Sequence, residues 1–209
     1  MNRTPTIFIV DDDPSVLKAV ARLLRSSGFD VITFESASKF MEARDPSVHG
    51  CIVLDLAMPD LGGIALQDAL LAAGTAQPII FLSGRGDIPT SVRAMKRGAV
   101  DFLTKPVRGD ELIRAVRAAL QKDLAARAER DQADRLNRLL ARLTAREREV
   151  LVHVASGKLN KQTAADLGTV EKTIKVHRAH IMEKLEVKSA AELARIAERA
   201  GFLASLFPD

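Results

Sequence analysis

Cys51-Ile52-Val53-Leu54-Asp55 is the stretch around which the first half of the 209-residue chain can be organised. Four consecutive apolar residues are typical of a strand that is buried on both faces of a parallel sheet. The run stops at the carboxylate of Asp55, and a loop containing Pro59 follows. Ligands of open α/β sheets bind beyond the carboxyl ends of the strands, so we expect Asp55 to belong to a functional site. An aspartate that only caps a turn is the alternative interpretation.

Short apolar strands alternate with amphipathic helices on both sides of this stretch. The expected strands are 7–10, 31–34, 51–54, 78–82 and 100–103, and the expected helices are 14–27, 38–43, 66–73, 88–97 and one from 110 onward. Five strand–helix units predict an α/β fold with a flavodoxin-like, parallel five-stranded sheet that is covered by helices on both faces.

The helix from residue 110 can continue to about 143, because residues 110–156 contain no Gly or Pro. Its apolar positions run through Leu120, Leu124 and Ala128, and charged residues such as Arg127 and Asp131 fill its middle. We interpret it as a solvated interdomain helix; a dimerising coiled coil is the alternative.

The pattern from Thr144 onward is wholly helical. Thr144 and Glu147 form a capping box that opens a first helix, Asn160 is expected to cap a second, residues 171–185 form a third, and Ser189 is expected to cap a fourth. Two short helices joined by a brief turn are typical of a helix-turn-helix unit. We therefore expect a domain at 1–120, a helical linker at 121–141 and an all-α, four-helix domain at 142–209.

Composition restricts the class of protein. The chain is 47% hydrophobic and 28% charged, which is typical of globular proteins. It contains no apolar run near 18 residues and no signal pattern, and its single cysteine excludes an internal disulfide, so a cytoplasmic location without a membrane partner is expected. Residues 1–120 hold 14 basic and 14 acidic residues, whereas 121–209 hold 17 and 13. The basic excess of the second part indicates an anionic partner.

Chemically active groups follow four of the expected strands: Asp11, Asp12 and Asp13 the first, Asp55 the third, Ser83 the fourth and Lys105 the fifth. Carboxylates gathered at one edge of a sheet repel one another unless a hard cation such as Mg²⁺ binds between them. A nearby ammonium and a hydroxyl suit a phosphoryl group, whose oxygens need countercharge. Asp55 is then the expected nucleophile, and an aspartyl phosphate is the expected product.

Residues 6–120 resemble the receiver domain of two-component response regulators. The motifs that carry the resemblance are Val10-Asp11-Asp12-Asp13, Leu54-Asp55-Leu56-Ala57-Met58-Pro59-Asp60-Leu61-Gly62-Gly63, Ser83-Gly84 and Lys105-Pro106. The resemblance implies that Asp55 accepts a phosphoryl group from a sensor histidine kinase. It assigns Mg²⁺ to Asp11, Asp12, Asp55 and the backbone carbonyl of Ala57.

The resemblance implies further roles around the same site. Ser83 is the hydroxyl that turns toward the phosphate, Lys105 pairs with the phosphate, and Phe102 is the switch aromatic. The peptide bond after Lys105 is cis in the family, and we expect Asp13 to cap the first helix. Arg85 stands where a histidine is frequent in close relatives, so the lifetime of the phosphate is expected to differ.

The expected helix 171–185 has two different faces. Ile174, Ile181 and Leu185 fall on one face as a core stripe does, whereas Val176 lies on the other side among lysines. An exposed valine beside lysines suits contact with thymine methyls and guanine edges in a major groove. An ordinary solvated basic face is the alternative interpretation.

Residues 142–203 resemble the LuxR-type helix-turn-helix domain of the NarL/FixJ group. The shared segments are 143–151, 160–161, 164–168 and 173–178. The residues that the resemblance assigns to DNA are Lys161 and Lys172 near phosphates, Lys175 and Val176 at base edges, Arg178, and Ala179, which stands where some relatives have a basic contact residue.

The two resemblances together predict a transcription regulator rather than an enzyme. Phosphorylation of Asp55 by the kinase is expected to create a homodimer that binds promoter DNA and activates transcription, with RNA polymerase as a further candidate partner. The expected dimer surface comprises Ile88, Val92, Met95 and Lys96. A DNA-binding regulator that does not depend on phosphorylation is the alternative. A Mg²⁺-dependent phosphatase with an aspartyl nucleophile would need a second acid where Ala57 stands.

Overall fold

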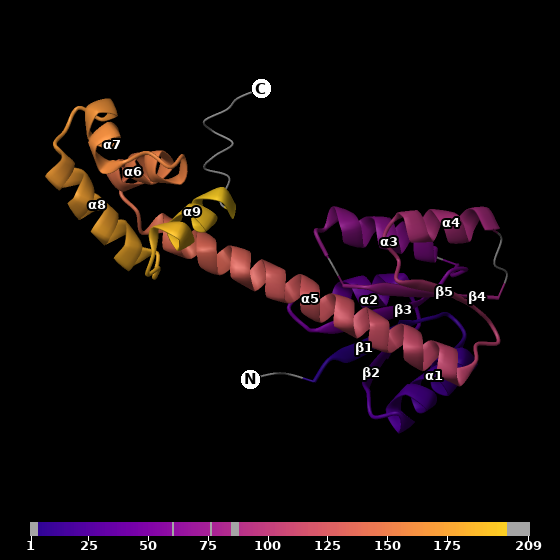
Figure 1. Cartoon of the computed structure of the whole chain (residues 1–209). Helices are drawn as coiled ribbons and strands as arrows, with labels where there is room; N and C mark the ends of the chain where they lie inside the picture. Colours follow the sequence, from indigo (N-terminus) through magenta and orange to yellow (C-terminus); the bar gives the residue numbers. More distant parts are fainter. Residues whose placement is uncertain (1–3, 60, 76, 85–87, 200–209) are drawn as a thin grey trace. The chain divides into compact units, whose positions relative to one another are not determined.

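The computed structural model describes residues 4–59, 61–75, 77–84 and 88–199, so Asp60 and Arg85 lie outside the described residues. The chain divides into two compact units, Met1–Ala128 and Glu129–Asp209. Figure 1 shows a sheet wrapped by helices in the first unit and, over the described residues, helices alone in the second.

The first unit is built on a parallel five-stranded sheet in the order β2-β1-β3-β4-β5. Its strands are β1 (Thr6–Val10), β2 (Asp30–Phe34), β3 (Gly50–Asp55), β4 (Ile79–Ser83) and β5 (Asp101–Thr104). β3 lies at the centre, and all of its residues are buried. The flavodoxin-like fold predicted from the sequence is confirmed, with Asp55 as the last residue of β3 rather than the first residue after it.

Five helices follow the strands: α1 (Pro14–Ser26), α2 (Ala37–Ala43), α3 (Gly63–Ala72), α4 (Ile88–Lys96) and α5 (Gly109–Ala141). Figure 1 shows α3 and α4 on one face of the sheet and α1 and α5 on the other. Asp13 caps α1 as expected, because its carboxylate accepts a hydrogen bond from the N–H of Ser15 at 2.8 Å.

Alternate residues of the central strands separate two hydrophobic cores. On the side of α1 and α5, the buried strand residues are Ile7, Ile9, Cys51, Val53, Ile80 and Leu82. On the side of α2, α3 and α4, they are Phe8, Val10, Ile52, Leu54, Ile79 and Phe81. A strand with apolar residues on both faces is thereby explained, since each face of β3 meets its own helices.

α5 begins in the first unit and ends in the second. Its buried positions in the first unit are Leu112, Ala115, Val116, Ala119 and Asp123. Leu124, which the apolar pattern placed on the inner seam, is 63% exposed. Arg127 is largely buried and its guanidinium bonds to backbone carbonyls of the first unit. The expectation of a solvated helix therefore holds for the exposed positions in this part of α5, but not for Asp123, which continues the inner stripe, or for Arg127.

The second unit contains α6 (Ala145–Ala155), α7 (Asn160–Asp166), α8 (Glu171–Lys184) and α9 (Ala190–Arg199). These helices enclose a core with the residues that end α5 and follow it: Leu139, Leu140, Leu143, Val150, Leu151, Val154, Ala164, Ile174, Ile181, Leu185, Leu193 and Ala197. Thr144 and Glu147 form the predicted capping box at the start of α6. Ser189 accepts a hydrogen bond from the N–H of Glu192, as expected of a cap before α9.

Within the ranges given above, the structure contains no helix with the length and apolar character needed to cross a bilayer.

Candidate functional site

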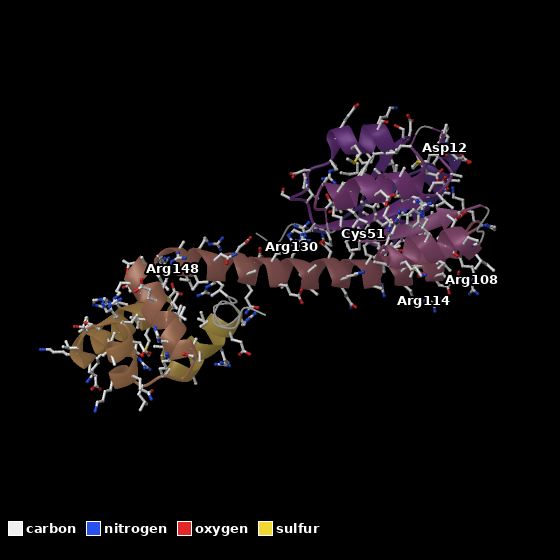
Figure 2. All side chains as sticks on the ribbon, turned by 90° about the horizontal axis from the view of Figure 1, so that it is seen from above. Asp12, Cys51, Arg108, Arg114, Arg130 and Arg148 are labelled. Carbon is white, nitrogen blue, oxygen red and sulfur yellow. The ribbon has the colours of Figure 1, made fainter. Side chains whose placement is uncertain are left out.

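Three carboxylates converge where β1 and β3 end side by side. Asp11 follows β1 directly and is 1% exposed, and Asp55 ends β3 and is 5% exposed. Asp12, on the rim of the unit (Figure 2), is exposed. One carboxylate oxygen of each of the three residues lies within 4.8 Å of the others. The neighbouring positions of β1 and β3 thus bring together residues that are 44 positions apart in the sequence.

Lys105 connects two of these carboxylates. It follows β5, and its Nζ lies 2.6 Å from Oδ2 of Asp11 and 2.6 Å from Oδ1 of Asp55. Burial works to lower the pKa of Lys105, but the hydrogen bonds to the two carboxylates outweigh it and raise that pKa. The ammonium therefore stays charged.

The charge balance of this cluster suits a cation. One ammonium faces three carboxylates, which leaves an excess of two negative charges when all are ionised. Burial raises the pKa of Asp11, although hydrogen bonds from Lys105 and from the N–H of Asp13 oppose this effect. Oxygen ligands with excess negative charge and an open, exposed member fit Mg²⁺, which retains several waters when it binds to proteins. Mg²⁺ is also the ion that the resemblance to receiver domains implied for these carboxylates.

The loop after β3 folds back closely onto Asp55. The N–H of Ala57 donates a hydrogen bond to Oδ2 of Asp55 at 2.8 Å, and Ala57 itself is exposed. The N–H of Gly63 bonds to the carbonyl of Leu56 at 3.0 Å. A Cβ at Gly63 would lie 2.4 Å from the carbonyl oxygen of Asp55, so this approach requires glycine.

The remaining site residues come from β4 and β5. Ser83 ends β4 and is 1% exposed, and its neighbour Leu82 pairs with Asp55 in the sheet. Phe102 on β5 is half-buried, with its ring centroid 6.2 Å from that of Phe81. The peptide bond after Lys105 is cis, as the resemblance implied. The structure thus brings the predicted phosphate set to one edge of the sheet.

The predicted dimer surface lies on α4. Ile88 is 78% exposed, Val92 45% and Met95 43%, and Lys96 is exposed beside them. Three large apolar side chains with such exposure on one short helix form a patch of the kind found at protein contacts.

The candidate DNA contacts lie on α7 and α8. Ile174 and Ile181 are buried and Leu185, just after α8, is 1% exposed, so the core stripe of this helix is confirmed. Val176 is 47% exposed. The other exposed candidates are Lys161, Lys172, Lys175 and Ala179.

Family models match both units. Residues 7–117 match the response regulator receiver domain, and residues 141–197 match the luxR family of bacterial regulatory proteins. The chain is a response regulator of the NarL/FixJ family. It is accordingly a transcription regulator of a two-component system, a class whose partners are a sensor kinase and promoter DNA.

Relatives and solved structures extend over nearly the whole regulator. It is 46% identical to the response regulator protein TodT of Pseudomonas putida over 95% of this chain and 87% of that protein. It is 43% identical to nodulation protein W of Bradyrhizobium diazoefficiens, over 95% and 88%. The solved structure of the response regulator StyR matches with 47% identity and a TM-score of 0.87, over 94% of this chain and 99% of that chain. Full-length FixJ from B. japonicum matches with 38% identity and a TM-score of 0.56, over 97% and 100%.

One predicted helix cap of the regulator is corrected by the structure. Leu159, not Asn160, is the N-cap of α7, and the N–H of Leu159 donates to the side chain of Gln162 at 2.9 Å. The amide oxygen of Asn160 instead accepts a hydrogen bond from Nη1 of Arg178 at 2.9 Å. Arg178 is half-buried. Through this hydrogen bond, one of its nitrogens joins α8 to α7.

Three other polar contacts of the regulator were not anticipated from the sequence. Nε2 of Gln67, a buried residue of α3, donates to the carbonyl of Ala94 in α4 at 3.3 Å. Lys184, at the end of α8, binds the buried carboxylate of Glu147 at 2.7 Å. Asp123 of α5 binds the N–H of Gly50 at 3.1 Å. Each contact joins distant parts of the chain, so no local pattern could have indicated it.

Proposed function

We propose that this regulator is switched by phosphorylation of Asp55. The observation that carries the proposal is the position of the Lys105 ammonium, 2.6 Å from both Asp55 and Asp11 at the edge of the sheet where Ser83 also ends its strand. The phosphoryl group would come from a histidine kinase. A carboxylate oxygen of Asp55 forms a bond to phosphorus as the bond from phosphorus to the kinase's histidine nitrogen breaks.

Residues of this chain stabilise the product of that transfer. Mg²⁺, when bound, neutralises charge on the phosphoryl oxygens. Asp11, Asp12, Asp55 and the carbonyl of Ala57 would hold it. The Lys105 ammonium supplies further countercharge, and the Ser83 hydroxyl donates to a phosphoryl oxygen.

The signal would then pass to α4. Once Ser83 and Lys105 turn toward the phosphate, Phe102 moves inward, and the surface formed by Ile88, Val92, Met95 and Lys96 becomes the dimer contact. A change from a mostly inactive to a mostly active population requires about 5 kcal/mol of differential stabilisation. Charge-assisted hydrogen bonds to the phosphate and burial of the apolar α4 patch are of that order together.

The output is DNA binding by α7 and α8. Lys175 and Val176 would contact base edges in a major groove, and Lys161 and Lys172 the phosphates. Arg178 and Ala179 complete the contact surface. A dimer would place two such units on half-sites about one helical turn apart, and we propose activation of transcription as the outcome.

The proposed functions correspond to three consecutive parts of the chain. Residues 1–120 are the receiver, 121–141 a helical linker and 142–209 the DNA-binding part. The matches to the two family models, at 7–117 and 141–197, support this assignment. The compact first unit runs to Ala128, so the start of the linker packs with the receiver.

The test compares wild type with Asp55→Asn. Acetyl phosphate is the phosphodonor, and Mg²⁺ is present. A duplex selected from random DNA by the phosphorylated wild type serves as the probe. We expect wild type to gain phosphate, to double its mass by light scattering and to bind the duplex at least tenfold more tightly, and Asp55→Asn to do none of these.

Asp13→Asn is the matched control. It changes a neighbouring aspartate whose side chain caps α1, and Asn is also a good cap, so this variant should respond as wild type does. If wild type binds the duplex equally well with and without phosphate, the phosphorylation switch is refuted and the regulator acts independently of phosphorylation.

A further inference from the structure

The end of β3 opposite to Asp55 is attached to α5 by two side chains. The carboxylate of Asp123, 4% exposed, accepts a hydrogen bond from the backbone N–H of Gly50 at 3.1 Å. Nε of Arg127, one turn further along α5, lies 3.0 and 3.1 Å from the two oxygens of that carboxylate. A strand start and a helix 73 residues later are therefore joined through one buried carboxylate.

The other two nitrogens of Arg127 bind the loop that precedes β3. Nη1 donates to the carbonyl of Ser47 at 3.2 Å and Nη2 to the carbonyl of Val48 at 2.7 Å. All three nitrogens of the guanidinium thus have partners within the first unit. We call this set, Asp123 and Arg127 with residues 47–50, the α5 clamp.

The α5 clamp depends on the backbone conformation of Gly50. Its φ is +150°, and a Cβ there would lie 1.7 Å from the carbonyl oxygen of Thr6 on β1. Only glycine can take this position, in which the backbone N–H faces Asp123. Without Asp123, that N–H would lose the partner it has in the structure.

Simple attachment of a helix does not require such a pair. A buried ion pair costs much desolvation, and apolar residues of similar size often stabilise a fold as well or better. Hydrogen bonds of fixed direction, in contrast, specify one position of α5 along the loop. The inner stripe of α5 is apolar from Leu112 to Ala119 and becomes polar only at Asp123 and Arg127.

The α5 clamp lies where α5 leaves the first unit, so it fixes the position of the helix at that point. Arg127 is followed by Ala128, the last residue of the first unit. Residues 128–131 are exposed, and at Gln132 the side chain already bonds to Arg199 of the second unit, at 2.9 Å. Among the residues that the structure describes, the clamp is therefore the last polar attachment of α5 within the first unit before the helix enters the other core.

We propose that Asp123 and Arg127 are positioning residues that attach the linker to the receiver, and that the phosphorylation state of Asp55 reaches the DNA-binding unit through this attachment. The second part rests on the proposed function. β3 runs from Gly50 at the clamp to Asp55 at the phosphate site, so one fully buried strand connects the two ends.

The experiment uses the full chain as wild type, Asp123→Ala, Arg127→Ala, Arg127→Lys and the double alanine variant. Arg130→Ala is the matched control, because Arg130 is an exposed arginine on the same helix, three positions further on (Figure 2). Hydrogen exchange is measured for peptides that cover 45–51 and 121–131. Affinity for the selected duplex is measured with and without acetyl phosphate.

Both alanine variants should exchange at least tenfold faster than wild type in the two peptides, and the double variant no faster than the single ones. Their gain in DNA affinity on phosphorylation should fall at least threefold, while phosphate uptake at Asp55 stays as in wild type. Arg127→Lys, which keeps the charge but loses the three directed donors, should be intermediate. Arg130→Ala should match wild type in all readouts.

Three results would overturn the proposal. Unchanged exchange in both peptides would remove the attachment, and faster exchange with an unchanged phosphorylation gain would remove the transmission. If wild type itself shows no gain, the proposed function fails together with transmission, whereas the exchange data still decide the attachment. Should Asp123→Ala not fold, Arg127→Lys carries the same comparison at a side chain that is 18% exposed.

Discussion

The ammonium group of Lys105 lies 2.6 Å from Oδ1 of Asp55. The same nitrogen lies 2.6 Å from Oδ2 of Asp11, so one positive charge is shared by two buried carboxylates. A phosphoryl group that arrives at Asp55 would therefore meet a lysine already in place, and the energetic role of that lysine can be tested without any phosphate.

Lys105→Met should make the stability of the first unit strongly dependent on Mg²⁺. Without the ammonium, two buried carboxylates face each other, and we expect a loss of about 2–4 kcal/mol in the free energy of unfolding. A divalent cation replaces the missing charge, so 10 mM MgCl₂ should raise the melting temperature of the variant more than that of wild type. Lys18→Met, at an exposed position of α1, is the control. Equal Mg²⁺ responses would contradict this role of Lys105.

The second unit should lose stability at acidic pH through Glu147. Burial works to raise the pKa of this carboxyl, but hydrogen bonds from Lys184 and Thr144 lower it below its usual range. A lowered pKa in the folded state gives stability that is present above the unfolded value of 4.5 and is lost as the pH falls further. Glu147→Gln should thus cost about 1–2 kcal/mol at pH 7 and progressively less below pH 4.5. Glu149→Gln, at an exposed position of the same helix, should show little change, because its ion pair with Arg146 is also exposed. Urea unfolding at several pH values measures the difference. A constant deficit from pH 7 to pH 3 would argue against the ion pair.

Cys51 should be inert to alkylation in the folded regulator. Burial, with a smaller effect from the negative charge of Asp123, raises the pKa of its thiol to about 12. At pH 8 roughly one thiol in 10,000 is then ionised, and the side chain is 0% exposed in the core between β3 and α1. Iodoacetamide should modify the native protein at least a hundredfold more slowly than the protein in 6 M guanidinium chloride. Rapid labelling in native buffer would show that β3 opens.

The proposed DNA contacts at Lys172 and Val176 should differ in how strongly the affinity for DNA depends on salt. Lys172→Ala should weaken binding to all duplexes alike and lower the slope of log affinity against log salt by about 1, since one phosphate contact is lost. Val176→Ala should leave the slope unchanged and relax the preference for particular bases. Lys188→Ala, exposed in the turn before α9, controls for net charge. A reduced slope for Val176→Ala would contradict its assignment to a base edge.

Much of the fold followed from periodicity alone. β3 was predictable because four apolar residues in a row, too few for a helix and followed by a loop, are typical of a strand with a helix layer on each face. The carboxylate cluster was predictable because the ends of parallel strands meet at one edge, which places Asp11 beside Asp55 whatever the loops do. The capping box of Thr144 and Glu147 is a local pattern, and it forms locally.

The errors arose where tertiary contacts replaced local rules. Asn160 has the side chain of a good cap, yet Arg178 binds its amide oxygen and Leu159 takes the cap position. The apolar pattern placed Leu124 on the buried face of α5. Asp123 lies there instead, because its carboxylate accepts hydrogen bonds from the N–H of Gly50 and from the guanidinium of Arg127. Asp123 and Arg127 look like an ordinary surface pair at i and i+4 until the loop before β3 is known.

The α5 clamp also sets an order of events during synthesis. Gly50 leaves the ribosome 73 residues before Asp123, and the carbonyl of Ser47 precedes Arg127 by 80 residues. At about 5–20 residues per second, roughly 4–15 s pass in which β3 exists without the group that accepts its first N–H. A nascent chain that ends at residue 117, where the match to the receiver family ends, already has the five strands of the described sheet and the proposed phosphate site but not this contact. Translation must continue through the start of the linker before the central strand is complete at both ends.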